Sequence, residues 1–363
     1  MSEKIRFAVV GCGHIGKRHA EMISRNGDCE LVALVDVKPE GELGLTPYGV
    51  PFFSSLDQLL CSHVDADVIT VATPNGLHFK QALQVLESGC HVVVEKPVTL
   101  NRDEAAQLIE VAKERSRRLF LVMQNRYSPP AVWLKEMISG GQLGQIFMIQ
   151  LNCYWNRDDR YYTPGSWRGT KNLDGGTLFT QFSHFIDIMY WLFGDVEYID
   201  SWLADFNHSQ LTEFEDSGMI RFKFENGAVG CLNFSTSVWN RNLESSLTVI
   251  AENGSVKIGG QYMDKVEVCH IKDYDMPELA PTNPENDYGS YKGSALNHHF
   301  IFENIVDVLR ESAEPAIDAT DGLKVIDLIE RIYAAAGKDS YMGKEYLSLR
   351  PSVQPQEDKP VIK

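Results

Sequence analysis

The most constraining stretch of the sequence is VVGCGHIGKRH, in which three glycines directly follow an apolar run. The run Ile5–Val10 predicts a buried strand, and the helical pattern after the glycines continues to about Ser24. Gly11, Gly13 and Gly16 lie between them with G-x-G-x-x-G spacing. Such glycines permit a tight turn and let the backbone approach a pyrophosphate that rests on the helix N-terminus. In a strand–turn–helix context this pattern is specific, and it predicts a Rossmann-type dinucleotide-binding domain.

An acidic residue follows the second apolar run, where folds of this type contact the adenosine ribose. Asp36 ends the predicted strand Glu30–Asp36 and stands 20 residues after Gly16. A carboxylate there accepts hydrogen bonds from the ribose hydroxyls and repels a 2′-phosphate. We therefore predict NAD rather than NADP as the cofactor, with His14 and Ile15 also in contact. The alternative, a glycine turn that binds nothing, is disfavoured by the strand–helix context.

Short apolar strands and helices alternate over the first third of the chain. Further strands are predicted within ADVITVATP, HVVVEKP and RRLFLVMQNR. Fully apolar short strands separated by helices are typical of a parallel sheet that is covered on both faces. We predict an α/β, doubly wound domain over residues 1–122.

The pattern changes at Gly144, where GQIFMIQLNCYW predicts a long strand, and strands then dominate to about Ile271. Two connections, Glu225–Gly227 and Glu252–Gly254, read ENG. Asn-Gly is a strong tight-hairpin signal, so we expect the strands that it joins to be antiparallel.

The last predicted elements are two helices, near Ser294–Glu311 and Thr320–Ala336. Strands joined by hairpins and accompanied by helices define an α+β domain with a large, mostly antiparallel open sheet, which we assign to residues 123–345. The Pro-rich polar tail, residues 346–363, is expected to be frayed.

Composition excludes several classes of partner. A formal net charge of −16 argues against nucleic acid, whose phosphates need a basic surface. No apolar run approaches the roughly 18 residues of a membrane span, and the charged N-terminus does not resemble a signal peptide. The seven cysteines are odd in number and include no CxxC pair, which indicates reduced thiols rather than disulfides or a zinc site. We predict a cytoplasmic protein with no metal site.

A lysine stands where ligands bind in doubly wound sheets. Lys96 lies in EKP, directly after the strand pattern HVVV. The carboxyl end of such a strand faces the ligand crevice, where a lysine can hydrogen-bond a substrate hydroxyl or stabilise an alkoxide. A surface lysine that opens a loop fits the position alone equally well.

A polar stripe runs along an otherwise apolar helix that we predict for Asp174–Asp195. Its residues recur at steps of three and four and share one face: Thr177, Thr180, Gln181, His184 and Asp187. Burying hydroxyls and amides against hydrocarbon is costly unless they are paired, so the stripe predicts a wet or ligand-filled cleft. We expect Asp187, one turn on, to orient the His184 imidazole. A satisfied core histidine is the alternative.

Four motifs occur in the order GCGHIGKRH, TPNGLH, EKP and GG…H-x-x-D, and they resemble the Gfo/Idh/MocA family of NAD(P)-dependent oxidoreductases. The later segment NHHFIFENIVDVL is similar to a helix of that family. The resemblance implies hydride transfer at a secondary alcohol of a sugar or cyclitol, with Lys96 and His184 at the reacting centre, and an open sheet that supports oligomers. Many members have an aspartate four residues before this histidine. Here Thr180 stands there, so Lys96 and His184 must share the acid–base work.

Two further stretches, VMQNRYSPP and GSWRGTKNLDGGTL, resemble a subgroup that oxidises C3 of UDP-N-acetylglucosaminuronic acid for bacterial surface polysaccharides. The cofactor contacts implied are Thr73, Pro74, Asn75, His78, Glu95, Lys96, Gln124, Trp167 and Arg168. The substrate contacts implied are Arg126, Tyr127, Arg157, Arg160, Tyr161, Thr180, Gln181, His184 and His298. We expect Lys96 to hydrogen-bond the reacting oxygen and His184, with an ordinary pKa near 6.5, to accept its proton.

The segment 153–171 has a net charge of +2 within this acidic chain, and it is rich in tyrosine and tryptophan. Guanidinium groups bind carboxylate or diphosphate oxygens bidentately, and aromatic rings stack on a uracil or a sugar. The segment therefore favours an anionic nucleotide-sugar, although dimer interfaces are enriched in the same residues.

Four functions remain open. The first is an NAD-dependent dehydrogenase of a UDP-linked aminosugar acid, and the second a dehydrogenase of a free sugar or inositol. The third is an NAD-requiring glycosidase, and the fourth a non-catalytic NAD-binding regulator, which the presence of both Lys96 and His184 disfavours. In each case we expect a homo-oligomer, a dimer or a tetramer, assembled through the open sheet.

Overall fold

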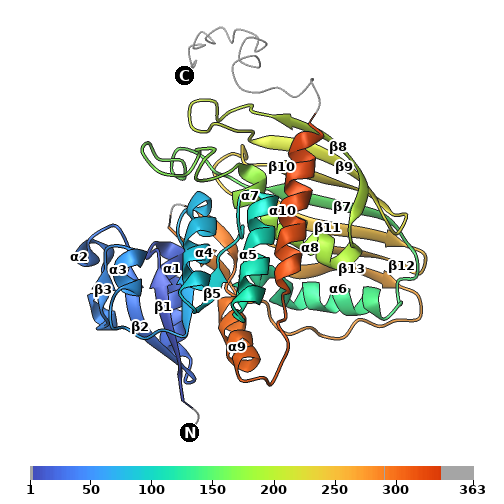
Figure 1. The fold of residues 1–363 in the computed structure, drawn as a ribbon. Coiled ribbons are helices and arrows are strands. Elements are labelled where there is room, and N and C mark those ends of the chain that lie inside the picture. The colour runs from blue at the N-terminus through green and yellow to red at the C-terminus, as the bar shows by residue number, and fades with distance from the viewer. Residues whose placement is uncertain (1–2, 290, 337–363) are drawn as a thin grey trace, which may run out of the picture.

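The computed structural model describes residues 3–289 and 291–336, and Figure 1 shows two sheets with helices packed around them. The first sheet has six parallel strands in the order β3-β2-β1-β4-β5-β6. These strands are β1 (Ile5–Val10), β2 (Cys29–Val35), β3 (Phe52–Phe53), β4 (Val68–Val71), β5 (His91–Val94) and β6 (Leu119–Leu121). The order reverses between β1 and β4, which creates the crevice where doubly wound sheets bind ligands.

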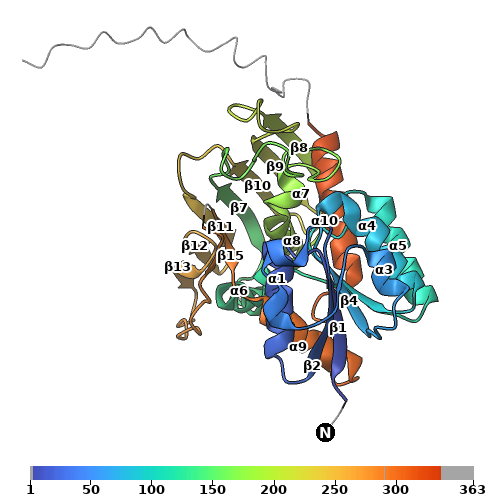
Figure 2. The same cartoon turned by 90° about the vertical axis from the view of Figure 1, so that its left-hand side faces the viewer.

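Helices cover both faces of the parallel sheet. Early helices and turns alternate with its strands: α1 (His14–Arg25), α2 (Glu40–Leu43), η1 (Thr46–Tyr48), α3 (Leu56–Leu60), η2 (Asn75–Leu77), α4 (His78–Glu87) and α5 (Arg102–Glu114). Two late helices, α9 (His298–Leu309) and α10 (Ala319–Ala334), return to the same sheet. In Figure 2, α1 and α9 lie on one side of it and α4, α5 and α10 on the other. The ring of Phe302 in α9 packs edge-on against Phe7 of β1, at 5.8 Å between ring centres.

The second sheet has seven strands in the order β13-β12-β11-β7-β10-β9-β8. They are β7 (Ile146–Tyr154), β8 (Val196–Ala204), β9 (Ser217–Phe224), β10 (Val229–Ser235), β11 (Glu244–Ala251), β12 (Gly254–Gly259) and β13 (Lys265–Ile271). Every neighbouring pair is antiparallel except β7 with β10. Both ENG sequences form the turns of hairpins, which join β9 to β10 and β11 to β12. The predicted fold class, a parallel doubly wound sheet plus an α+β domain with a mostly antiparallel sheet, is confirmed. The division at residue 122 stays a prediction.

One face of the second sheet packs against helices, and no element of the described chain covers the other, which we call the open face. The covering helices are α6 (Pro129–Ser139), α8 (Ser183–Phe193) and α10, in front of the sheet in Figure 1. The open face carries exposed Met148, Met219 and Tyr198, together with ion pairs such as Arg221–Asp200 and Lys223–Glu197. A small hairpin, β14 (Glu285–Asp287) and β15 (Lys292–Ala295), lies outside both sheets.

The single helix predicted for Asp174–Asp195 is wrong. The chain forms a one-turn helix α7 (Thr177–Thr180), breaks, and continues as α8. At the break the Phe182 amide donates to the Thr177 carbonyl, five residues back, instead of to the carbonyl four residues back. This kink lets the Gln181 side chain accept a hydrogen bond from Arg157, which follows β7, while Phe182 and Phe185 pack on Trp155 in the core.

The strand predicted in RRLFLVMQNR is also shorter than its apolar pattern. It ends at Leu121, and a 3₁₀ turn η3 (Gln124–Tyr127) follows. All seven cysteines are free thiols. Within residues 3–289 and 291–336, no helix has the length and apolarity needed to cross a membrane. The predicted tail, residues 346–363, lies outside the described residues.

Candidate active site

A cavity of about 1060 Å³ lies between the carboxyl ends of the parallel strands and helix α8. It is lined at one end by the glycine turn and Asp36, and at the other by Thr180, Gln181 and His184. This volume is at the upper end of the range for small-molecule sites. Because Thr180, Gln181 and His184 line the cavity, part of the polar stripe predicted from the sequence faces a ligand cleft. Thr177 and Asp187, at the ends of the stripe, do not line it: the Thr177 hydroxyl donates to the Glu215 carbonyl.

The glycine turn is shaped for a dinucleotide. Gly11 has φ +87°, and a Cβ there would lie 2.6 Å from the Ala72 carbonyl oxygen. A Cβ at Gly16 would lie 1.7 Å from the Gly11 carbonyl oxygen, so helix α1 starts against the turn only because both residues are glycine. A Cβ at Gly13 would meet nothing within 4 Å. The open side of Gly13 and the N-terminus of α1 thus fit a pyrophosphate, as predicted.

Asp36 is held at the predicted ribose position. One carboxylate oxygen accepts a hydrogen bond from the Cys12 amide at 2.7 Å, and the other from the Lys38 amide at 2.9 Å. These bonds join the end of β2 to the glycine turn and fix the carboxylate at the cavity wall. The other predicted cofactor contacts also line the cavity: His14, Ile15, Thr73, Pro74, Asn75, His78, Glu95, Lys96, Gln124, Trp167 and Arg168.

Lys96 enters the cavity from the end of β5. Its Nζ donates to the Thr180 carbonyl oxygen at 2.6 Å, which joins the parallel sheet to the α7–α8 segment. Burial lowers the pKa of Lys96 to about 8, with the nearby Arg157 charge acting in the same direction and Glu95 opposing it. An amine with this pKa can exchange a proton with a substrate near neutral pH.

His184 lines the cavity from α8 and is 3 % exposed. The Gln124 side-chain amide donates to its Nε2 at 3.3 Å, while Nδ1 has no hydrogen-bond partner within the described chain. Burial, with the Lys96 and His298 charges adding to it, holds the pKa of His184 well below its usual range. The imidazole is therefore neutral at physiological pH, and the sequence-based premise of an ordinary pKa is wrong.

Asp187 does not orient His184. Its carboxylate accepts three hydrogen bonds from the Arg126 guanidinium, whose Nη2 lies 2.6 Å from Oδ1, and Arg126 also pairs with Asp321. Arg126 is thus neutralised inside the protein and does not line the cavity. Tyr127, next to it, stacks on Phe300 at 5.3 Å. The structure therefore places neither Arg126 nor Tyr127 at the predicted substrate position.

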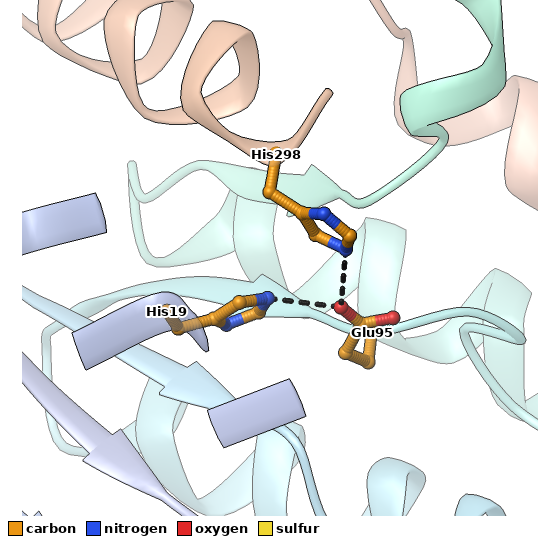
Figure 3. Close-up of side chains that lie close together, drawn as sticks. All are labelled: His19, Glu95 and His298. Carbon is orange, nitrogen blue, oxygen red and sulfur yellow. Dashed lines mark hydrogen bonds and ion pairs between the residues drawn. The ribbon is translucent and has the colours of Figure 1, made fainter. Parts of the chain in front are cut away.

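Three buried side chains, His19, Glu95 and His298, meet at the residue that precedes Lys96 in the chain, and Figure 3 shows how they lie. His19 of α1 contacts Glu95 through Nε2 at 2.9 Å, and Nε2 of His298 lies 3.8 Å from the same carboxylate oxygen. The His19 hydrogen bond and the two imidazoles outweigh burial and hold the pKa of Glu95 well below its usual range. These are also the three groups in the described chain whose ligand atoms could converge on a metal ion, within 4.8 Å of one another. Glu95 and His298 both line the cavity.

The part of the cavity beside the α7–α8 segment is cationic and aromatic. The Arg157 guanidinium, 2 % exposed, lies 4.8–5.2 Å from the ring centres of Trp155, Tyr161 and Tyr291. It donates to four neutral oxygens, on Gln181, Asn156, Asn242 and Lys292. Arg168 stands over Tyr161 and Trp167, and its Nε has no partner among the described residues.

Arg160, in contrast, lies outside the cavity. It is exposed and pairs with Asp158 two residues away. Of the predicted substrate contacts, Arg157, Tyr161, Thr180, Gln181, His184 and His298 are therefore brought together, whereas Arg126, Tyr127 and Arg160 are not.

Sequence reasoning missed the contribution of the β14–β15 hairpin. Tyr288 packs against His14 of the glycine turn at 5.3 Å, and Tyr291 forms part of the cationic end. No local pattern around these tyrosines signals the contact, because the hairpin and the glycine turn are far apart in the chain. Asp174 was missed too. It is buried, and its carboxylate lies behind Thr180.

The dinucleotide cradle, with a lysine and a histidine facing it across one cavity, defines an NAD-dependent oxidoreductase. Two family models match the chain. The oxidoreductase family model with an NAD-binding Rossmann fold covers residues 5–123, and the GFO/IDH/MocA C-terminal domain model covers residues 132–257. The chain belongs to the Gfo/Idh/MocA family.

Solved structures of the same architecture include two WlbA dehydrogenases in complex with NADH and UDP-GlcNAcA. The Bordetella pertussis protein is 33 % identical and matches 92 % of this chain and 97 % of its own, with a TM-score of 0.82. The Chromobacterium violaceum protein is 29 % identical over 93 % of this chain and 94 % of its own, also with a TM-score of 0.82. A D-glucoside 3-dehydrogenase of Escherichia coli is 28 % identical over 53 % of this chain and 55 % of its own length.

Proposed function

We propose that this protein is an NAD-dependent dehydrogenase that oxidises the C3 hydroxyl of a UDP-linked N-acetylated aminosugar acid to a ketone. The observation that carries the proposal is the unpaired cationic end of the cavity. Within residues 3–289 and 291–336, no carboxylate lies within ion-pair distance of Arg157 or Arg168. A buried charge without a counter-ion is costly. An anionic ligand that enters the cavity therefore gains a strong interaction there.

The aromatic rings around these arginines support a nucleotide-sugar. Tyr161, Trp167 and Tyr291 line the same end of the cavity, and their faces can stack on a uracil or a sugar ring. Guanidinium groups bind carboxylate and phosphate oxygens in bidentate geometry. The two WlbA structures, which contain NADH and UDP-GlcNAcA, agree with such a ligand.

The proton chemistry follows from the two unusual pKa values. Bound NAD supplies the hydride acceptor. Lys96, with its pKa lowered to about 8 by burial, accepts the proton of the C3 hydroxyl. His184 stays neutral and hydrogen-bonds the oxygen, because burial keeps its pKa too low for it to act as the base. These roles reverse the ones that the sequence alone suggested.

We further propose a cytoplasmic enzyme of surface-polysaccharide synthesis that works as a dimer or tetramer. The open face of the second sheet, with exposed Met148, Tyr198 and Met219, is the surface that we assign to self-association. Light scattering at micromolar concentration tests this assembly, and a monomer would contradict it.

A free-sugar dehydrogenase is the second candidate, which the similarity to the D-glucoside 3-dehydrogenase favours. A substrate panel separates the two. NADH formation is measured with UDP-N-acetylglucosaminuronic acid, with UDP-N-acetylglucosamine, which lacks the carboxylate, and with glucose, methyl glucoside and inositol. We expect saturable turnover with the UDP-linked acid and a weaker response to its neutral analogue. Saturable turnover only with the free sugars would overturn the proposal, and release of nitrophenol from a nitrophenyl glycoside without net NADH would indicate a glycosidase.

A further inference from the structure

A buried carboxylate lies behind Thr180, one turn before His184 along the chain. The Thr180 hydroxyl donates to the side chain of Asp174, six residues earlier. The second Asp174 oxygen accepts a hydrogen bond from the Gly169 amide at 2.8 Å. Asp174 is 1 % exposed, and no basic side chain of the described chain lies within ion-pair distance of it.

Two glycines make this arrangement possible. Gly175 and Gly176, directly after Asp174, have φ values of +92° and +135°, which side chains other than glycine rarely adopt. A Cβ on Gly176 would also lie 2.3 Å from the Tyr333 hydroxyl oxygen. The reversal at these glycines starts the single turn of α7 and leaves the Asp174 side chain behind Thr180, which ends that turn.

Thr180 also holds the side chain of Lys96. The Lys96 Nζ donates to the Thr180 carbonyl oxygen at 2.6 Å. The Asn75 side-chain amide donates to both the Thr180 hydroxyl, at 2.7 Å, and the Asp174 carbonyl oxygen, at 2.8 Å. Thr180 is thus fixed on its side chain by Asp174 and Asn75, while its carbonyl aims the ammonium group into the cavity.

We propose that Asp174 is the positioning carboxylate of Lys96: it anchors Thr180, and Thr180 holds the lysine at the reacting hydroxyl. This inference rests on the role of Lys96 in the proposed function, but it does not depend on which sugar is oxidised.

The charges around Asp174 and Lys96 predict the direction in which the pKa of Lys96 should change when Asp174 is replaced. The Asp174 and Glu95 anions favour protonated Lys96, while burial and Arg157 oppose it, and the pKa of Lys96 is about 8. Removing the Asp174 charge therefore lowers the pKa of Lys96 further. Burial raises the pKa of Asp174 itself to about 6, against the Thr180 and Gly169 hydrogen bonds and the Arg168 and Lys96 charges. The neutral His184 adds no charge to the balance.

The test compares Asp174→Asn with Asp158→Asn, which removes an equal charge from a partly exposed loop residue that does not line the cavity. The proton affinity of Lys96 is measured by competitive acetylation with acetic anhydride over a pH series, with peptide mass spectrometry as the readout. This measurement needs no sugar. Turnover is measured in parallel with UDP-N-acetylglucosaminuronic acid, and NADH binding by fluorescence serves as the folding control.

We expect Asp174→Asn to shift the Lys96 titration to lower pH and to reduce kcat by about 10²-fold, as a small misplacement of a reacting group does. Asp158→Asn should change neither. Thr180→Val should reproduce the loss of kcat and Thr180→Ser, which keeps the hydroxyl, should restore it. If Asp174→Asn does not fold, the comparison of Thr180→Val with Thr180→Ser decides whether the contact between Asp174 and the Thr180 hydroxyl positions Lys96.

An unchanged Lys96 titration in folded Asp174→Asn would overturn the inference, as would a Thr180→Val enzyme with full activity and an unshifted lysine. If the wild-type protein does not oxidise the UDP-linked acid, the proposed function fails. The acetylation result still decides the role of Asp174.

Discussion

The two ends of the cavity are built in opposite ways. The dinucleotide end comes from adjacent segments, since Gly11, Gly16 and Asp36 lie within one strand–helix–strand unit and are fixed by backbone contacts. The substrate end assembles residues from the segment that follows β7, the α7–α8 segment and the β14–β15 hairpin around Arg157. The first end is built from local backbone contacts, whereas the second depends on side chains that are distant in the chain, and we propose that the second end selects the substrate. Substitutions at the two ends should therefore have separable effects.

The largest effect is expected from Lys96→Met, which removes the proposed proton acceptor at the boundary between the two ends. Turnover should fall by roughly 10²- to 10⁴-fold, the usual worth of a positioned acid–base group. NADH binding, measured by fluorescence, should be retained because the glycine turn is untouched. Lys171→Met, a change outside the cavity, is the control. Near-normal turnover in Lys96→Met would remove the lysine from the mechanism.

Arg157→Met should affect the substrate end alone. We expect KM for the UDP-linked acid to rise about 10- to 100-fold, since hydrogen bonds to charged groups are worth about 1.5–3 kcal/mol. NADH affinity should stay unchanged. Arg160→Met is a matched control three residues away, because its guanidinium is exposed and lies outside the cavity. Equal KM changes in both variants would mean that the cationic cluster does not bind substrate.

Asp36→Ala should affect the dinucleotide end alone. The variant loses the contact to the ribose of NADH and the charge repulsion against the 2′-phosphate of NADPH. The preference for NADH over NADPH should therefore narrow by about 10-fold. Titration of both cofactors in wild type and variant measures this, with the surface change Glu30→Ala as the control. Wild-type protein that binds NADPH as tightly as NADH would contradict the ribose assignment.

The pH dependence should be the mildest effect. Lys96 must lose its proton before it can accept another, and burial lowers its pKa to about 8. Consequently, kcat/KM should rise about tenfold per pH unit below this value and level off above it. NADH affinity should show no such step. An acid limb near the ordinary histidine pKa would instead identify His184 as the base.

The sequence predicted what depends on local backbone geometry. The glycine turn, Asp36, both hairpins and the placement of Lys96 at a strand end follow from spacing and strand pattern. The kink after Thr180 was not predictable, because the apolar pattern of Phe182 and Phe185 continues through it. Spacing also suggested that Asp187 would pair with His184, but Arg126, 61 residues from Asp187, takes that carboxylate.

The misplaced substrate contacts have a related cause. Arg126 and Arg157 look alike in sequence, and only their tertiary contacts distinguish them. Arg126 pairs with Asp187 and Asp321, whereas Arg157 is buried among aromatic rings and has no carboxylate within ion-pair distance in the described chain. Arg160 differs from both, because it pairs with Asp158, its near neighbour in the sequence, at the surface.

Single-turnover oxidation of UDP-N-acetylglucosaminuronic acid deuterated at C3 tests whether the protein removes hydride from C3 of this sugar. We expect the deuterium to be transferred to the nicotinamide, the ketone to form at C3, and Arg157→Met to slow the reaction only at subsaturating substrate. Retention of the deuterium on the sugar while unlabelled NADH forms would show that the hydride leaves another carbon. That result, or the absence of NADH formation from this substrate, would contradict oxidation at C3.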